Sequence, residues 1–172
     1  PSGTRWRNMN VGASRVEESG DYYQWGEVVT KNIYNFANYD PLGNGTNQYD
    51  NLDTNISGTQ YDAARQNLGG YWRMPTKAEF TELANNCDWQ WVTINGQTGH
   101  RLTSKINGNS IFLPAAGYRY EGNKGNLGSN GFYYSSEPES TTSSRAYGLE
   151  FGSGSTDHRV TMNYQIQFYR YH

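Results

Sequence analysis

Apolar and polar residues alternate in short runs in the middle of the chain, and turn-forming pairs separate these runs. Residues 89–94 read WQWVTI and residues 110–113 read SIFL, with another strand-like run at 100–106 between them. Asn-Gly pairs at 95–96 and 107–108 separate the runs, and Asn-Gly is the strongest short-range signal for a tight β-hairpin. The pattern therefore predicts two consecutive hairpins.

Two short helices are predicted before these strands. Residues 62–67 form a helical run that Gly69 and Gly70 close. Thr76 and Glu79 have the spacing of a capping box, in which the two side chains satisfy backbone amides at the start of a helix. We expect the apolar side chains of this second helix to face the core, namely Phe80, Leu83 and Ala84.

Apolar and polar residues alternate again near the end of the chain. Residues 147–151 and 164–170 predict two terminal strands with one loop between them. Residues 114–131 are rich in glycine, which keeps the backbone permissive and favours turns. The long polar stretch at 40–58 predicts an extended surface loop.

Composition requires a core built from a small number of large side chains. Only 34% of the residues are apolar and the mean hydropathy is −0.92, yet 15% are aromatic. Charged residues make up 17% and glycines number 20, a balance that favours short strands and many turns over long helices. A chain of 172 residues fits one domain, so we expect a single loop-rich α+β domain over residues 1–172.

Charge and hydropathy argue against two classes of partner. The net charge is −2, the pI is near 5.9 and Lys and Arg form no run, so we expect no nucleic-acid binding. No apolar stretch approaches the roughly 20 residues of a transmembrane helix. The chain starts inside what reads as a motif, at Pro-Ser-Gly-Thr, and we expect an export signal or an upstream domain before it.

The residue types that catalysis requires do not occur at any recognisable spacing. Cys87 is the only cysteine, which excludes an internal disulfide and a Cys-based zinc site, and we expect it to be a small buried residue. His100, His158 and His172 share no spacing with each other or with a nucleophile. We therefore expect no enzyme, no cofactor and no metal site. Oxygen-bearing side chains of the 40–58 loop could hold a structural calcium ion, but they lack the final Glu of an EF-hand loop and a solvated loop is favoured: Asp40, Asp50, Asp53 and Asn55.

Several motifs occur in a fixed order along the chain. The first are Pro-Ser-Gly-Thr-x-Trp at 1–6 and Gly-Asp-Tyr-Tyr-x-Trp-Gly-Glu at 20–27. The middle contains Ile-Ser-Gly-Thr-x-Tyr-Asp-Ala-Ala at 56–64, Trp-Arg-Met-Pro-Thr at 72–76 and Phe-Leu-Pro-Ala-Ala-Gly-Tyr-Arg at 112–119. Together they resemble the Fibrobacter succinogenes major paralogous domain of exported bacterial proteins. The resemblance covers most of the chain, from its start to about residue 151.

That family is similar to formylglycine-generating enzymes and to C-type lectins. The resemblance implies a C-type-lectin-like fold with two short helices and a small twisted antiparallel sheet. It implies no enzyme activity here, because formylglycine-generating enzymes use a pair of active-site cysteines and this chain has Cys87 alone. The Glu-Pro-Glu at 137–139 only partly matches the sugar-binding triplet of calcium-dependent lectins, and the second lectin motif is missing. We expect a turn with two solvated carboxylates at these residues.

The same group includes the variable proteins of diversity-generating retroelements, in which exposed C-terminal positions are rewritten by mutagenesis. Relatives usually close with an Arg-Tyr-x-Gly-x-x-Val-Arg type of strand. Residues 163–172 keep Tyr164 and Arg170 but depart from that strand at several positions. The resemblance thus implies a candidate variable region from about residue 132, while an ordinary divergent relative is the open alternative.

The C-terminal third is rich in Tyr, Ser, Gly and Asn, the mixture that dominates antibody binding surfaces. Tyr147, Tyr164 and Phe168 lie in predicted strands, where packing into the core is the competing role, and Arg170 suits a structural ion pair or hydrogen bond better than a ligand contact. We expect the loops between 135 and 170 to form one exposed face. The candidate ligand-binding residues are Tyr134, Glu137, Glu139, Ser144, Arg145, Tyr147, Glu150, Ser153, Ser155, Asp157, His158, Arg159, Thr161, Asn163, Gln165, Gln167, Tyr169 and Tyr171.

These observations predict a ligand-binding domain of the adhesin or receptor type. The expected ligand is a protein or a carbohydrate, and the expected location is extracellular, at a cell surface or on a phage particle. Two alternatives stay open. One is a structural module of a surface appendage or phage tail, and the other is a carbohydrate-binding lectin-like domain.

Overall fold

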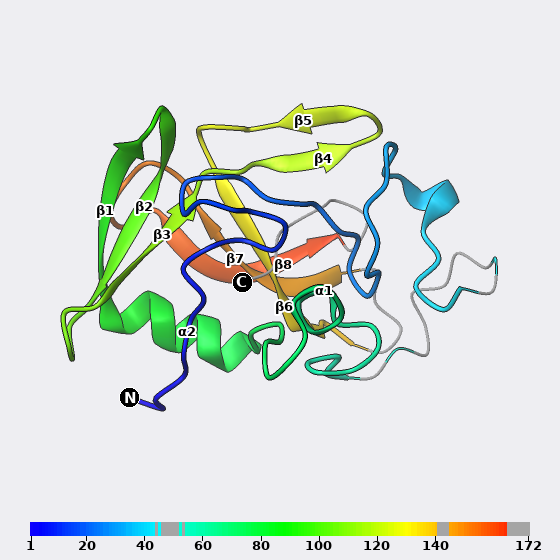
Figure 1. The fold of residues 1–172 in the computed structure, drawn as a ribbon, viewed down its shortest axis with the longest axis horizontal. Coiled ribbons are helices and arrows are strands. Elements are labelled where there is room, and N and C mark those ends of the chain that lie inside the picture. Colours follow the sequence, from blue (N-terminus) through cyan, green and yellow to red (C-terminus); the bar gives the residue numbers. More distant parts are fainter. Residues whose placement is uncertain (44, 46–51, 53, 141–144, 165–172) are drawn as a thin grey trace.

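The computed structural model describes residues 1–43, 45, 52, 54–140 and 145–164, and for 163 and 164 it describes the backbone alone. Strands dominate this part of the chain (Figure 1). The helical elements are η1 (Phe36–Asn38), α1 (Ala63–Leu68) and α2 (Lys77–Asn86). The strands are β1 (Cys87–Ile94), β2 (Gln97–Ser104), β3 (Ser110–Pro114), β4 (Tyr118–Tyr120), β5 (Asn123–Gly125), β6 (Gly131–Pro138), β7 (Arg145–Phe151) and β8 (His158–Tyr164).

The strands form three small antiparallel sheets, in the orders β1-β2-β3, β4-β5 and β6-β7-β8. The predicted consecutive hairpins are confirmed as the first of these sheets. Asn95 and Gly96 both have positive φ, 47° and 81°, which is the conformation that a two-residue hairpin turn requires. Figure 1 shows α2 below the strands β6, β7 and β8, with the β4–β5 hairpin above them.

The expected α+β class with one small sheet is wrong. The chain is mostly β, with eight strands in three sheets and only two short α-helices in the described part. The error arises at residues 114–131, where a loop-rich region was expected and β4 and β5 occur, and in β6, which follows at Gly131–Pro138. Strand β6 is buried on both faces over most of its length, so its sequence lacks the alternation that marks a half-buried strand.

The second predicted terminal strand is also misplaced. Strand β8 occupies His158–Tyr164, where a loop was expected, and the remainder of the predicted strand at 164–170 lies outside the described residues. Polar residues occupy most of β8, and only Val160 and Met162 supply the apolar side of the alternation. The signal was therefore too weak to separate this strand from the loop before it.

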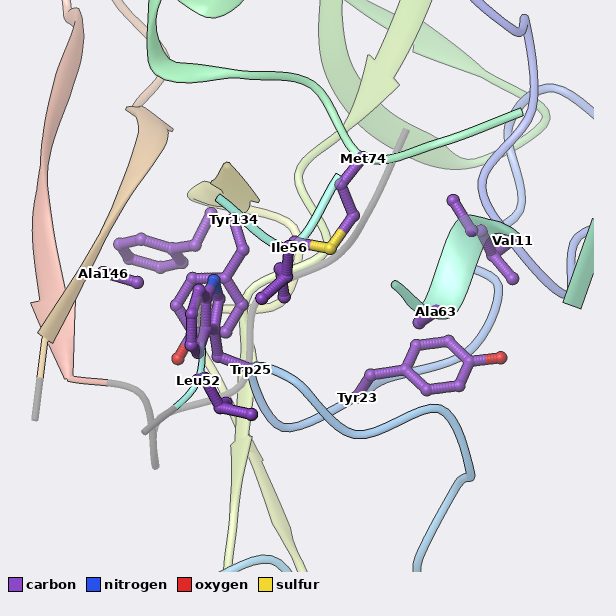
Figure 2. Close-up of a cluster of buried hydrophobic side chains, with 11 residues drawn as sticks. Val11, Tyr23, Trp25, Leu52, Ile56, Ala63, Met74, Tyr134 and Ala146 are labelled. Atoms are coloured by element: carbon purple, nitrogen blue, oxygen red, sulfur yellow. The ribbon is translucent and has the colours of Figure 1, made fainter. Parts of the chain in front are cut away.

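Strand β6 lies between two core clusters because its neighbouring side chains point to opposite faces. Tyr134 belongs to the first core cluster, with Trp25, Ile56 and Ala146, and Figure 2 shows the Trp25 and Tyr134 rings beside each other. The Trp25 indole Nε1 donates a hydrogen bond to the Ser135 carbonyl at 2.9 Å. The N-terminal segment is thereby fixed to β6.

Tyr133 belongs to the second core cluster, on the other side of β6. Its hydroxyl donates to the Pro114 carbonyl at 2.6 Å, which joins β6 to the end of β3. Helix α2 begins with the predicted capping box of Thr76 and Glu79. Its predicted inner face is confirmed by the burial of Phe80, Leu83 and Ala84, and Cys87 is buried as expected. None of the helices in the described ranges is long and apolar enough to cross a membrane.

Candidate functional site

The predicted ligand-binding residues fall into two groups, at opposite ends of strand β7. The β6–β7 connection precedes Arg145, and the β7–β8 loop (residues 152–157) follows Phe151. Seven strand residues at about 3.3 Å each separate these connections by roughly 20 Å. An antiparallel meander places successive connections at alternate ends, so the described residues beside Arg145 and the β7–β8 loop lie at opposite ends of β7.

The β7–β8 loop carries the most exposed of the predicted residues. Ser153, Ser155 and Asp157 are all exposed. The loop is closed by backbone hydrogen bonds from Gly152 N to Asp157 O at 2.9 Å and from Asp157 N to Gly154 O at 3.0 Å. A Cβ added at Gly152 would lie 2.1 Å from Oδ2 of Asp157, so this carboxylate sits directly over the glycine. The result is a compact loop that presents short polar side chains.

Two imidazoles lie beneath this loop. His158 stacks on Trp89, with ring centroids 4.0 Å apart and an interplanar angle of 4°. His100 is fully buried, and its Nε2 lies 2.7 Å from the carbonyl oxygen of Gly152, the first residue of the loop. Burial lowers the pKa of both histidines below the ordinary value for imidazole. Uncharged rings therefore support the loop at neutral pH.

The outer part of the β7–β8 sheet continues from the loop. Glu150 pairs across the strands with Arg159, and their side chains approach to 3.4 Å. The next pair along the same face is Gly148 with Thr161, and the Thr161 side chain is half-buried. The Arg159 side chain is 70% exposed, so its ion pair with Glu150 is screened by solvent and contributes little to stability. This face is polar next to the loop, where Arg159 is exposed and Glu150 and Thr161 are half-buried, and it is buried further along, at Gly148.

A second polar surface lies where β6 and β7 meet the start of α2. Glu137 accepts a hydrogen bond from the Lys77 backbone N–H at 2.7 Å, and the Lys77 ammonium lies 3.8 Å from the centroid of the Tyr147 ring. Arg145 donates two hydrogen bonds to the Glu139 carboxylate, at 2.7 Å and 3.0 Å. We call these five residues the Lys77–Tyr147 surface. Most of its polar groups are already engaged within the protein.

Two expectations about these residues need correction. Tyr134 is fully buried in the first core cluster and is no contact residue, because a chain so poor in aliphatic residues must bury its aromatic ones. The Glu-Pro-Glu segment is no turn with solvated carboxylates, since it closes the end of β6, Pro138 is buried and both carboxylates have protein partners. The remaining predicted positions lie outside the described side chains: Ser144, Asn163, Gln165, Gln167, Tyr169 and Tyr171.

Sequence reasoning missed Lys77, Trp89 and His100 as partners of the predicted residues. The capping box at Thr76 places Lys77 in the first turn of α2, but no local signal shows that this turn meets Tyr147. Strand alternation likewise places Trp89 and His100 in a hairpin without indicating that the β7–β8 loop packs on it. Such contacts depend on the pairing of whole sheets.

Among the described residues, the predicted contact residues do not line the groove of about 860 Å³ in the structure. This groove lies between residues 3–8, the second half of α2 and the β2–β3 turn. Within the described part of the chain, no three His, Cys, Asp or Glu side chains come together in a way that could hold a metal ion. Of the four residues considered for calcium, Asp50 and Asp53 lie outside the described residues, whereas Asp40 and Asn55 are described.

No protein-family model matches the chain, and no curated protein or solved structure matches it either. The expected α+β, C-type-lectin-like fold with one small sheet is wrong, because the described part of the chain is mostly β and forms three sheets. The observed arrangement is three small antiparallel sheets with two short α-helices, and no solved structure supports the lectin-like assignment.

Proposed function

We propose that this chain is a ligand-binding domain, and that the β7–β8 loop and the adjoining strand face make the contact. The observation that carries the proposal is the abrupt change from buried side chains at the end of β7 to exposed side chains in the β7–β8 loop. Leu149 and Phe151 are 0% and 1% exposed, whereas Ser153, Ser155 and Asp157, only a few residues later, are exposed. A rigid core thus supports a short polar loop.

This arrangement suits a surface whose contacts can change while the fold stays constant. Exposed side chains that make no core contact can usually be replaced at a cost within about 0.5 kcal/mol. Arg159, two residues after Asp157, adds an exposed cationic side chain with five hydrogen-bond donors to the hydroxyls and the carboxylate of the loop. Such a mixture can recognise hydrogen-bonding groups on a protein or on a carbohydrate, and both ligand classes belong to the proposal.

We further propose that the exposed positions are the ones that differ between relatives, as the resemblance to retroelement-diversified proteins implies. The test is to sequence the same locus from many related isolates and to compare substitution densities. Changes should concentrate at Ser153, Ser155, Asp157 and Arg159, with the neighbouring core residues Tyr133, Leu149 and Phe151 constant. An even scatter over exposed positions throughout the chain would contradict a specialised C-terminal contact face.

A further inference from the structure

The buried imidazole of His100 joins the β7–β8 loop to the hairpin sheet. A carbonyl oxygen can only accept a hydrogen bond, so Nε2 of His100 must donate its hydrogen to the Gly152 carbonyl. Nδ1 of the same ring is buried without a hydrogen-bond partner in the described structure. The neutral ring with its proton on Nε2 satisfies this arrangement, while a second proton on Nδ1 would place an unpaired charge in the interior.

The surroundings of His100 are mainly aromatic. Trp89 and Trp91 from β1 and Phe151 from β7 contact the ring with their edges or faces, at centroid distances of 5.1, 5.0 and 5.3 Å. His158 from β8 is stacked against Trp89. These neighbours exclude water from the imidazole and supply no charge to compensate a proton.

The charged and titratable groups that face the two rings, among the described residues, are Asp157 and the other imidazole. Burial is the largest cause that lowers the pKa of His100, and His158 lowers it further, while the carbonyl of Gly152, the Asp157 carboxylate and the Gln90 backbone oppose the shift. Burial also lowers the pKa of His158, against the opposing effects of the Ser155 backbone, the Ala84 backbone and, last, Asp157. The pKa of both rings is lowered despite these opposing groups, so the effect of burial outweighs them.

We propose that His100 and His158 hold the β7–β8 loop closed while both rings are neutral and release it when they are protonated. Binding through this loop would then weaken in acid, a consequence that rests on the proposed function. The closed loop shields the imidazoles, whereas an open loop returns them to solvent. Acid therefore favours the open form because that form takes up protons that the closed form excludes.

The sign and size of the effect follow from proton linkage. A histidine whose pKa is lowered in the closed form contributes its full stability above the ordinary value of 6.5, and this contribution is lost as the pH falls below that value. At pH 5, one ring that is protonated only in the open form raises the equilibrium constant for loop opening by up to about 30-fold. His158 is only half-buried, so its protonation changes the equilibrium constant for loop opening less than protonation of His100 does.

The test is amide hydrogen exchange of the whole chain at pH 7.5 and pH 5.0, corrected for the intrinsic pH dependence of exchange. The amides of Gly152 and Asp157 report on the loop because each donates a hydrogen bond within it. Their protection should fall at pH 5.0, by up to about 30-fold for each ring that is released. The Glu121 amide, which donates to Tyr34 O far from any described imidazole, should keep its protection.

A double variant separates titration of the two rings from a general effect of acid. His100→Gln keeps a side-chain N–H for the Gly152 carbonyl, and His158→Phe keeps a flat ring over Trp89, so neither new residue titrates in this range. The variant should show equal loop protection at both pH values. Two results would overturn the proposal. One is equal loop protection in the wild type at both pH values, and the other is a loss of protection at pH 5.0 in the variant as large as in the wild type.

If the double variant does not fold, the wild-type imidazoles decide the question by NMR titration. A pKa for His100 at or above 6.5 would overturn the proposal, and a lower one would support it. None of these measurements uses a ligand. A domain that binds nothing could still show the acid-sensitive loop, so failure of the proposed function and failure of this inference are distinguishable.

Discussion

Replacing Tyr134 by alanine tests whether this residue belongs to the core or to a binding face. The side chain is 0% exposed and packs with Trp25, Ile56 and Ala146 in the first core cluster. Large aromatic-to-alanine changes in a core remove buried apolar area and leave a cavity, at a cost of about 3–5 kcal/mol. We expect Tyr134→Ala to lower the free energy of unfolding by that amount, which for a chain of this size lowers Tm by roughly 6–20 °C.

The matched control is Tyr120→Ala, the same substitution in strand β4, where the side chain is 46% exposed. This variant should lose less than about 1 kcal/mol, because half of its ring is already in contact with water. Urea unfolding followed by circular dichroism measures both free energies under one set of conditions. A loss below 1 kcal/mol for Tyr134→Ala, or equal losses for the two variants, would refute the assignment of Tyr134 to the core.

Three further predictions concern buried groups. Trp25→Phe removes the indole donor to the Ser135 carbonyl and should cost at least about 1–3 kcal/mol in urea unfolding, and a cost near zero would contradict the hydrogen bond. Gly148→Ala places a Cβ 2.6 Å from the Tyr133 carbonyl oxygen and should destabilise by about 1–3 kcal/mol, measured in the same way. Burial raises the pKa of the Cys87 thiol, so it should react with a thiol reagent in urea and resist the reagent in the native chain at pH 8, and equal rates would contradict its burial.

The elements that the sequence predicts correctly are those with local causes. Asn95 and Gly96 adopt the positive φ angles of a hairpin turn whatever surrounds them, and the capping box of Thr76 and Glu79 begins α2 within four residues. Strand β6 has no such local mark. Tyr133 and Tyr134 are adjacent yet both buried, because β6 separates two clusters, and a strand buried on both faces loses its period-two pattern.

The candidate site was predictable only in part, for a related reason. Composition points to the exposed loop residues Ser153, Ser155 and Asp157, since short polar side chains beside glycines favour turns. Composition does not show that the β6–β7 connection leaves the opposite end of β7 from this loop, and it gives no indication that His100 supports Gly152. Both facts follow from pairing between strands that are far apart in the sequence.

The central claim is that the exposed β7–β8 region makes the ligand contact, and a binding measurement with two variants tests it most directly. The probes are an array of defined glycans and an array of purified bacterial surface proteins. One variant replaces four exposed side chains of the proposed contact face by alanine: Ser153, Ser155, Asp157 and Arg159. The control variant replaces three exposed side chains of the β2–β3 turn by alanine: Lys105, Asn107 and Asn109.

Both variants should unfold at the wild-type urea midpoint, because each change lies on the surface. We predict that the loop variant loses at least about ten-fold in affinity for any probe that the wild type binds, which corresponds to about 1.4 kcal/mol, and that the turn variant binds as the wild type does. Unchanged binding by the loop variant, or a loss in the turn variant alone, would contradict the claim and place the contact surface elsewhere on the domain.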